Sequence, residues 1–309
     1  MTGTFIVSLD CEGKWGMADG LQPYHRQLTD SALARAYESL ISIFARHDIA
    51  ATFAYVMAFT LTPEEREILR GSLEPQEGEA DPWMRHFWDA RARGDIEGWF
   101  QPQALEIVRQ DGRHEIACHG FCHRPLGDSS ISEAGARAEL RAADAVARIK
   151  GLTPSTFIFP RNEVGHLDVL REAGFLGYRE LLARPGGKLG KAIRLAEEFN
   201  VRPRPQRSKP PRADGLVPIP AGYFFNWRFG ARARVPVAAT LARWKHLIDR
   251  SAEGGVVHLW LHPHNLITAP ATRPPLEAVL AHAARRRDEG RLRILTQQSY
   301  CEAMTQRPL

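Results

Sequence analysis

The sequence predicts an α/β protein built as a (β/α) barrel of the TIM type. Seven or eight strand-like apolar runs alternate with helical patterns over 309 residues, as expected for parallel strands joined by helices. The unusual polar residues follow predicted strands at their carboxyl ends, where a parallel barrel builds its active site. No internal repeat and no linker divides the chain, so we expect residues 1–309 to form a single domain.

The first half of the chain opens on a strand, a helix and a second strand. The apolar run Thr4–Leu9 predicts a buried strand, and Thr29 is a candidate N-cap for a helix over 31–47. Further elements are expected in chain order: a strand at 51–57, a helix from Thr62, an insertion near 71–100, a helix at 103–109, strands at 115–118 and 156–159, and between them a helix at 132–150.

The second half continues the same alternation. Its predicted elements are a helix at 167–173, a strand at 177–182, a basic insertion near 183–215, a strand at 216–225, a helix at 237–251, a strand at 256–261, a helix at 275–287, a strand at 292–295 and a final helical turn at 298–304. The regular strands are thus enough for a barrel with loop insertions.

The composition excludes several classes of protein. No apolar run reaches about 18 residues, so we expect no membrane span, and the N-terminus lacks the pattern of a signal peptide, which favours a cytoplasmic protein. The 41 basic and 36 acidic side chains give a net charge of only +5. We therefore expect no nucleic-acid partner, although the surplus would suit an anionic substrate. Four cysteines are too few for a disulfide framework.

Two strand ends carry the residues of a candidate metal site. His119 and His123 follow the predicted strand at 115–118, and Asp10 and Glu12 follow the first strand. Two imidazoles and one carboxylate leave open coordination positions, the pattern of a catalytic metal. A second carboxylate can act as general base, and His262, after another strand, can donate a proton to a leaving group. These are the parts needed to hydrolyse an amide or ester.

The same residues resemble a known family. The ordered motifs are Asp10-Cys11-Glu12, His119-x-x-x-His123, Phe159-Pro160-Arg161-Asn162 and Leu261-His262-Pro263-His264. They are similar to those of the polysaccharide deacetylases, the NodB-homology group or carbohydrate esterase family 4, from residue 4 to about 300. The nearest resemblance is to the branch in lipopolysaccharide O-antigen and surface-polysaccharide biosynthesis, in which Asp-x-Glu replaces Asp-Asp. The resemblance implies a distorted (β/α) barrel with seven regular strands.

The resemblance also implies roles for the metal site. Asp10 would be the catalytic base, with Glu12, His119 and His123 as ligands of a divalent metal. That metal would most often be Zn²⁺, with Co²⁺, Ni²⁺ or Fe²⁺ in some members. The substrate would be an N-acetylated sugar, nucleotide-linked or lipid-linked.

The remaining roles fall on the third and fourth motifs. Arg161 would orient the base, although here Pro160 precedes the arginine whereas the family has arginine first. His262, favoured over His264, would protonate the leaving amine. Asn162 and His264 are expected to contact substrate. The family's aspartate that polarises the acid histidine has only Asp214 as a loose counterpart.

Other functions remain open on the same residues. Relatives of this barrel also open cyclic amides, imides and ureides, and a non-catalytic carbohydrate-binding descendant is a further alternative. Two His and a carboxylate also form the facial triad of Fe(II) oxygenases, but the strand–helix alternation speaks against that class. Cys118 and Cys122 have three residues between them rather than the two of a c-type haem motif, so we expect them to pack as small apolar side chains.

Overall fold

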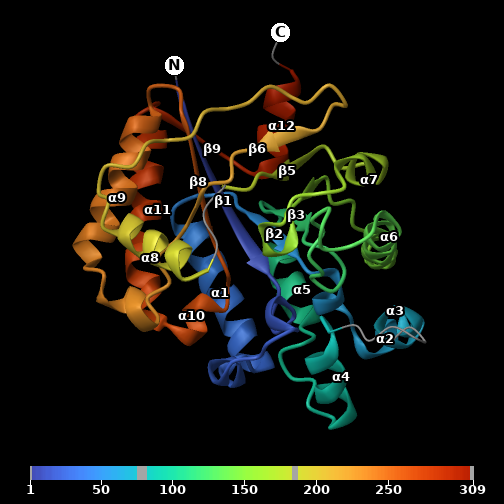
Figure 1. Cartoon of the computed structure of the whole chain (residues 1–309). Coiled ribbons are helices and arrows are strands. Elements are labelled where there is room, and N and C mark those ends of the chain that lie inside the picture. The colour runs from blue at the N-terminus through green and yellow to red at the C-terminus, as the bar shows by residue number, and fades with distance from the viewer. Residues whose placement is uncertain (1, 75–81, 183–186, 307–309) are drawn as a thin grey trace.

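The computed structural model describes residues 2–74, 82–182 and 187–306. Within these residues the strands form one sheet in the order β6-β5-β4-β3-β2-β1-β8-β7, and β9 also pairs with β1 (Figure 1). All the strand pairings are parallel. The strands are β1 (Gly3–Cys11), β2 (Thr52–Tyr55), β3 (Glu115–Cys118), β4 (Thr156–Phe157), β5 (Gly177–Arg179), β6 (Val217–Ile219), β7 (Tyr223–Phe224), β8 (Val256–Leu261) and β9 (Leu292–Leu295).

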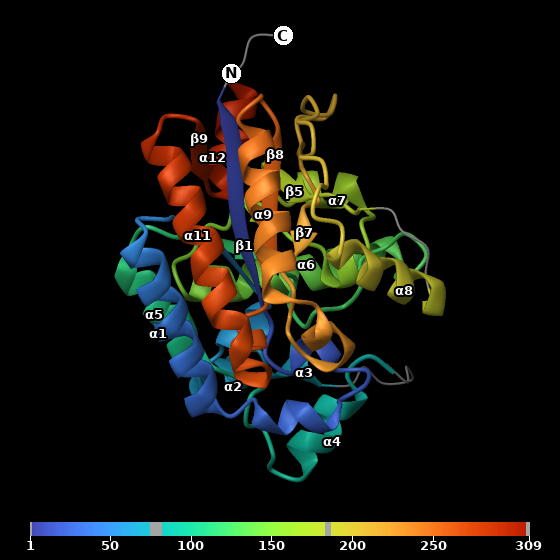
Figure 2. The same ribbon diagram turned by 90° about the vertical axis from the view of Figure 1, so that its left-hand side faces the viewer.

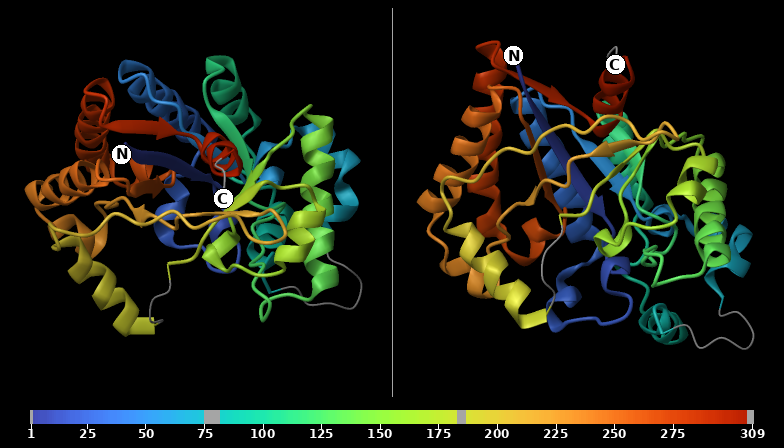
Figure 3. Two further views of the ribbon diagram at one scale, coloured as in Figure 1. Left: turned by 90° about the horizontal axis from the view of Figure 1, so that it is seen from above. Right: turned by 45° about the horizontal axis from the view of Figure 1, so that its top comes forward.

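A single run of chain joins the two edges of this sheet. The sequence predicts one strand over 216–225, but the structure divides it into β6, which pairs with β5, and β7, which pairs with β8. The break falls at Gly222, whose φ is +69°, and a Cβ there would overlap the carbonyl oxygen of His258. Because only glycine allows this close approach, the chain can pass from one edge to the other and complete a distorted barrel (Figure 3).

Strand β1 pairs with three other strands. All nine of its residues are buried. It pairs with β8 over Thr4–Leu9. On its other side it pairs first with β9, over Gly3–Ile6, and then with β2, over Ser8–Cys11. A strand covered on both faces needs a nearly continuous apolar run, which is what the sequence provides up to Asp10.

Helices cover the outside of the sheet. In Figure 2, α9 (Val237–Ser251) and α11 (Arg273–Asp288) stand side by side in front of β1 and β8. Thr29 caps α1 (Asp30–Arg46) and Ser132 caps α6 (Glu133–Ile149), each accepting a bond from a backbone N–H of the first turn. The other α-helices are α2 (Pro63–Ile68), α3 (Arg70–Leu73), α4 (Arg85–Ala92), α5 (Pro102–Asp111), α7 (Leu167–Glu172), α8 (Gly187–Glu198), α10 (Asn265–Thr268) and α12 (Gln297–Thr305).

The two expected insertions contain short helices. The first, near 71–100, includes α4 and the end of α3, and its residues 75–81 lie outside the described part. The second, near 183–215, includes α8, and its residues 183–186 also lie outside. Three predicted strands end early: 51–57 stops at Tyr55, 156–159 stops at Phe157, and 177–182 stops at Arg179. Among the described residues, no helix has the length and apolar character needed to cross a membrane.

A buried carboxylate ties the amino ends of the strands together, and its removal should destabilise the fold. Glu115 accepts hydrogen bonds from the Thr52 and Thr156 hydroxyls and from the backbone N–H of Gln298. Glu115→Ala leaves these donors unpaired, so we expect the free energy of unfolding to fall by about 3 kcal/mol. Urea denaturation measures this. Glu106→Ala, at an exposed surface ion pair, should cost less than about 1 kcal/mol; equal losses in the two variants would contradict the account.

Candidate active site and metal centre

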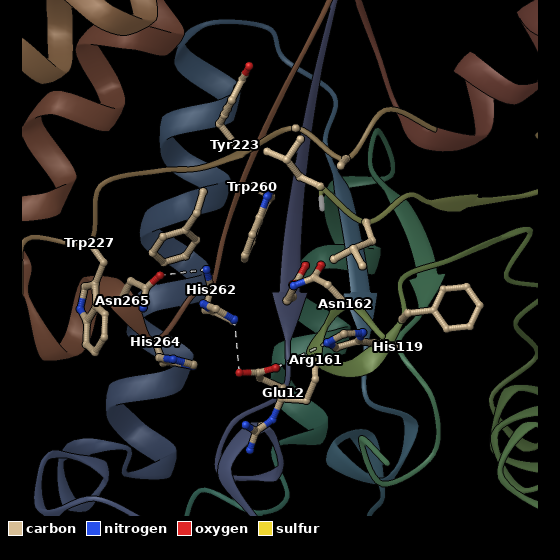
Figure 4. Close-up of a pocket in the computed structure, with 18 of the residues that line it drawn as sticks. Glu12, His119, Arg161, Asn162, Tyr223, Trp227, Trp260, His262, His264 and Asn265 are labelled. Carbon is tan, nitrogen blue, oxygen red and sulfur yellow. Dashed lines mark hydrogen bonds and ion pairs between the residues drawn. The ribbon is translucent and has the colours of Figure 1, made fainter. Parts of the chain in front are cut away.

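The structure brings together the three residues expected to bind a metal. Glu12 directly follows β1 and is only 6% exposed. Its Oε2 atom lies 3.0 Å from His123 Nε2 and 3.5 Å from His119 Nε2, at the carboxyl end of β3. One ligand atom from each of the three residues lies within 4.8 Å of the others, and Figure 4 shows Glu12 facing His119 across the floor of the pocket. The sequence thus located this convergence correctly.

The protonation states of the two rings suit a divalent cation. His119 Nδ1 lies 2.7 Å from the carbonyl oxygen of Ile158, which can only accept, so Nδ1 carries the proton and the lone pair lies on Nε2. That buried Nε2 has no hydrogen-bond partner among the described residues. Burial lowers the pKa of His123 to about 4, so its ring is neutral. Neutral imidazoles and a carboxylate are the donors that Zn²⁺ prefers, and the site therefore fits the metal.

The turn that presents the two histidines is fixed from outside by Glu139 of α6. One oxygen of this buried carboxylate accepts the backbone N–H groups of Phe121 at 2.9 Å and Cys122 at 2.8 Å. The turn also needs positive φ angles, +79° at Gly120 and +63° at His123. Sequence reasoning missed Glu139. The available signal was a glutamate on the apolar stripe of an otherwise alanine-rich amphipathic helix.

The expected base, Asp10, is held by an arginine from another strand. Arg179, the last residue of β5, donates to Asp10 Oδ1 at 2.8 Å and to Oδ2 at 2.7 Å. Burial acts to raise the pKa of Asp10, but the charge and hydrogen bonds of Arg179, together with the nearby His119 and His262, bring the pKa below its usual value. Arg179 also donates to Asn162 Oδ1 at 2.9 Å and lies 4.5 Å over the Trp260 ring. Asp10 is therefore an ionised, oriented carboxylate beside the metal ligands.

Arg161 does not make the contact that the family resemblance implied. Its guanidinium binds Asp19 and lies 5.0 Å over the Trp83 ring. The reason is local: Arg161 and Asn162 have φ angles of +57° and +56° in the turn after β4, and Asn162, rather than Arg161, reaches the pair of Asp10 and Arg179. The sequence held a signal for Arg179, because an arginine in an apolar strand needs a buried carboxylate partner.

Behind Asp10, a neutral histidine fixes the arginine. His258, on β8, is fully buried, and burial lowers its pKa to about 3. Its Nδ1 donates to the Pro220 carbonyl oxygen at 2.7 Å, so its Nε2 accepts the Ser8 hydroxyl at 2.8 Å. The Ser8 oxygen in turn accepts from Arg179 at 3.3 Å. This chain of bonds orients Arg179; the sequence analysis did not single out Ser8 or His258.

Two further histidines approach the other side of Glu12. His262 Nε2 lies 3.4 Å from Glu12 Oε1, and the His262 backbone N–H donates to Asn265 Oδ1. Burial, followed by the charge of His262, lowers the pKa of His264 to about 3. Because a neutral ring cannot donate the required proton near pH 7, this favours His262 over His264 as the acid. Asp214 instead pairs with Arg212 on a loop, and no contact with His262 is seen in the described residues.

These groups line a cavity of about 770 Å³. Asn162 and His264, the two residues expected to contact substrate, both lie on its wall. Tyr24, Phe224 and Trp227 add aromatic surface on the side of β7. A cavity of this size and mixed lining holds a small organic ligand.

The cysteines near the site are buried and unreactive. Cys118 and Cys122 are both free and buried. Burial raises the pKa of Cys118 to about 12 and that of Cys122 well above its usual value. The reactive form of cysteine is the thiolate, so both side chains act as small apolar groups under the histidine turn.

Known structures share the fold. No protein-family model and no curated protein matches the sequence. A structure from Mycobacterium smegmatis, described as a polysaccharide deacetylase, is 16% identical with a TM-score of 0.60, covering 99% of this chain and 91% of that one. A structure from Pseudomonas aeruginosa PAO1, also described as a polysaccharide deacetylase, is 14% identical with a TM-score of 0.59, covering 99% and 92%. The PuuE allantoinase is 13% identical with a TM-score of 0.54, covering 97% and 89%.

At these identities the likeness establishes the fold alone. The chain has the distorted (β/α) barrel of the solved polysaccharide deacetylases and of the allantoinase. The resemblance stated from the motifs is confirmed at that level.

The position of Glu12 depends on a glycine four residues later, which gives a test with a matched control. A Cβ on Gly16 would overlap the Glu12 carboxylate, whereas a Cβ on Gly20 would meet nothing within 4 Å. We expect Gly16→Ala to weaken zinc binding by about 10-fold to 100-fold, the usual effect of disturbing a ligand's support. Gly20→Ala should bind zinc like the unaltered protein. Competition with a zinc-sensitive dye measures both, and equal affinities would contradict the placement of Glu12.

Proposed function

We propose that this protein is a metal-dependent hydrolase that removes the acetyl group from an N-acetylated sugar in bacterial surface-polysaccharide, or O-antigen, biosynthesis. The observation that carries the proposal is the meeting of Glu12 with His119 and His123 beside an ionised Asp10. The motif resemblance and the shared barrel fold support the same assignment.

The metal and the chain have separate tasks in this proposal. Glu12, His119 and His123 would hold a divalent ion, with Zn²⁺ the first choice for this donor set. When bound, such an ion polarises a carbonyl group and makes water more acidic. Asp10 takes a proton from the attacking water, and Arg179 keeps Asp10 ionised and oriented for that step.

The remaining step is proton delivery. As the carbon–nitrogen bond of the acetamide breaks, protonated His262 gives its proton to the amine nitrogen, and acetate and the free amino sugar result. The His262 ring faces the cavity at the end of β8. Asn162 is braced by Arg179 and lies on the cavity wall, where its amide is available to the sugar. The surplus of basic side chains over acidic ones would suit a nucleotide-linked or lipid-linked sugar, both of which carry phosphate.

Metal removal is the direct test of this function. The protein should release acetate from nucleotide-linked N-acetyl sugars, and exhaustive chelation should abolish turnover until Zn²⁺ is restored. Glu12→Ala and His123→Ala should lose both the ion and the activity, because each removes a ligand. His246→Ala, on the outer helix α9, is the control and should keep both. Acetate release that persists after exhaustive chelation would contradict the proposal.

The two arginines give a second test, because they make different contacts. Arg179→Gln removes the charge that offsets burial at Asp10, so the pKa of Asp10 should rise and the acidic limb of kcat/KM should move to higher pH. The value of kcat should fall by about 10²–10⁴-fold, the contribution of a general base. Arg161→Gln, whose partner is Asp19, should leave the pH profile in place. A pH profile that moves in Arg161→Gln and not in Arg179→Gln would contradict the assignment.

A second hydrolase function uses the same site on a different substrate. The likeness to the allantoinase fold favours cyclic ureides as the alternative substrate class. A substrate panel of acetylated amino sugars and cyclic ureides separates the two functions. The deacetylase function predicts turnover of the acetylated sugars, and the alternative predicts turnover of the cyclic ureides.

A further inference from the structure

The carboxylate of Glu12 faces two pairs of histidines, and the proposed function uses only one pair as ligands. Its Oε2 atom is directed at His119 and His123, and its Oε1 atom lies 3.4 Å from His262 Nε2. One ligand atom each from Glu12, His262 and His264 also lies within 4.8 Å of the others. In Figure 4 the two oxygens of Glu12 are directed to opposite sides, one toward His262 and the other toward His119. The second group therefore has the same compactness and donor types as the first.

The second pair is held in place and has buried, unused nitrogen atoms. The rings of His262 and His264 stack with centroids 4.8 Å apart and an interplanar angle of 16°. His264 is only 8% exposed, and the Nδ1 atoms of both rings have no hydrogen-bond partner within the described ranges. A cation between Glu12 and the two rings would bind His262 through Nε2, the nitrogen that faces the carboxylate, while Nδ1 would carry the ring proton.

We propose that Glu12, His262 and His264 form a second divalent-cation site, so that Glu12 bridges two ions when the metal is in excess. A carboxylate between two pairs of imidazoles matches the general plan of two-metal centres, whose ions lie about 3.5–4 Å apart. Nothing in the motif resemblance calls for this second ion.

Charge makes the second site the weaker one. Two divalent ions would share the single carboxylate of Glu12, and the charge of the neighbouring Asp10 is already balanced by Arg179. Cation affinity falls when fewer anionic ligands serve each ion, and the two ions also repel each other. The first ion therefore binds at low metal concentration and the second only at higher concentration.

The second ion would act as an inhibitor, and this part rests on the proposed function. A cation on the lone pair of His262 prevents that ring from carrying the proton destined for the leaving amine. Activity should rise with metal as the first site fills and then fall as the second site fills. The fall should reach about 100-fold or more, the range of a general acid's contribution.

The structural test locates the ions directly. Crystals of the full chain, soaked with one equivalent or with an excess of Zn²⁺, are measured at the zinc edge. We expect one anomalous peak between Glu12, His119 and His123 at one equivalent, and a second peak between Glu12, His262 and His264 in excess. His264→Asn should lose only the second peak. His25→Gln is the control, because His25 is buried on the same cavity wall but lies outside both groups; it should keep both.

The outcomes separate this inference from the proposed function. A first peak without a second, at any zinc concentration, overturns the inference and leaves the function standing. No peak at either position overturns both. A second peak that survives His264→Asn, or disappears in His25→Gln, overturns the ligand assignment.

An activity measurement gives an independent readout. The ratio of maximal acetate release to release at millimolar Zn²⁺ should fall from about 100 in the unaltered protein to near 1 in His264→Asn, whatever the basal rate of that variant. A ratio unchanged by the substitution would overturn the inhibitory role.

Discussion

The site depends on one buried negative charge, the carboxylate of Glu12. Removing a carboxylate from water costs several kcal/mol unless positive charge or hydrogen bonds compensate. Burial accordingly acts to raise the pKa of Glu12, but the electrostatic effect of the surrounding histidines, His262 first and then His123, brings it well below its usual value. Glu12 has imidazoles around it and no arginine or lysine in direct contact among the described ion pairs. An environment that stabilises the anion through ring nitrogens is one that a divalent cation can enter.

Much of the surrounding structure serves to hold this charge in place. Strand β1 is buried along its whole length and ends at Cys11, two residues after its apolar run. The next residue, Glu12, therefore lies on the floor of the cavity. Gly16 leaves the space that the carboxylate occupies. Glu139, from outside the barrel, fixes the turn that supplies the two histidines. These three supports come from distant parts of the sequence and meet only in the folded chain.

The two neighbouring carboxylates differ because their partners differ. Asp10 is paired with Arg179, whose charge is permanent. Asp10 therefore stays ionised and can accept a proton. Glu12 is surrounded by imidazole nitrogens instead, so its oxygens can serve as metal ligands. Both residues leave the same strand two positions apart, and their separate roles are set by β5 and β3, which supply these partners. One strand end thus provides both a candidate base and a candidate ligand.

The sequence predicted those features that depend on local pattern. Strand and helix boundaries at 115–118, 237–251, 256–261 and 292–295 were predicted to the residue, because the apolar patterns that indicate them are local. It also predicted the meeting of Glu12 with His119 and His123, since parallel strand ends share one face of a barrel. An arginine in the apolar strand at 177–182 indicates a buried carboxylate partner for Arg179, but not which one. That this partner is Asp10, and that Arg161 turns away, depends on the left-handed turn at Arg161 and on the register of β5. The division of β6 from β7 depends on the close approach of Gly222 to β8, which is likewise a tertiary property.

The central claim is that Glu12, His119 and His123 together bind one divalent ion. Zinc-edge X-ray absorption spectroscopy of the protein with one equivalent of Zn²⁺ tests this most directly. The account predicts a first shell of nitrogen and oxygen atoms at about 2.0–2.2 Å, with the outer-shell scattering of two imidazole rings. A sulfur neighbour at about 2.3 Å, which would indicate Cys118 or Cys122, or a spectrum of unbound hydrated zinc, would contradict it.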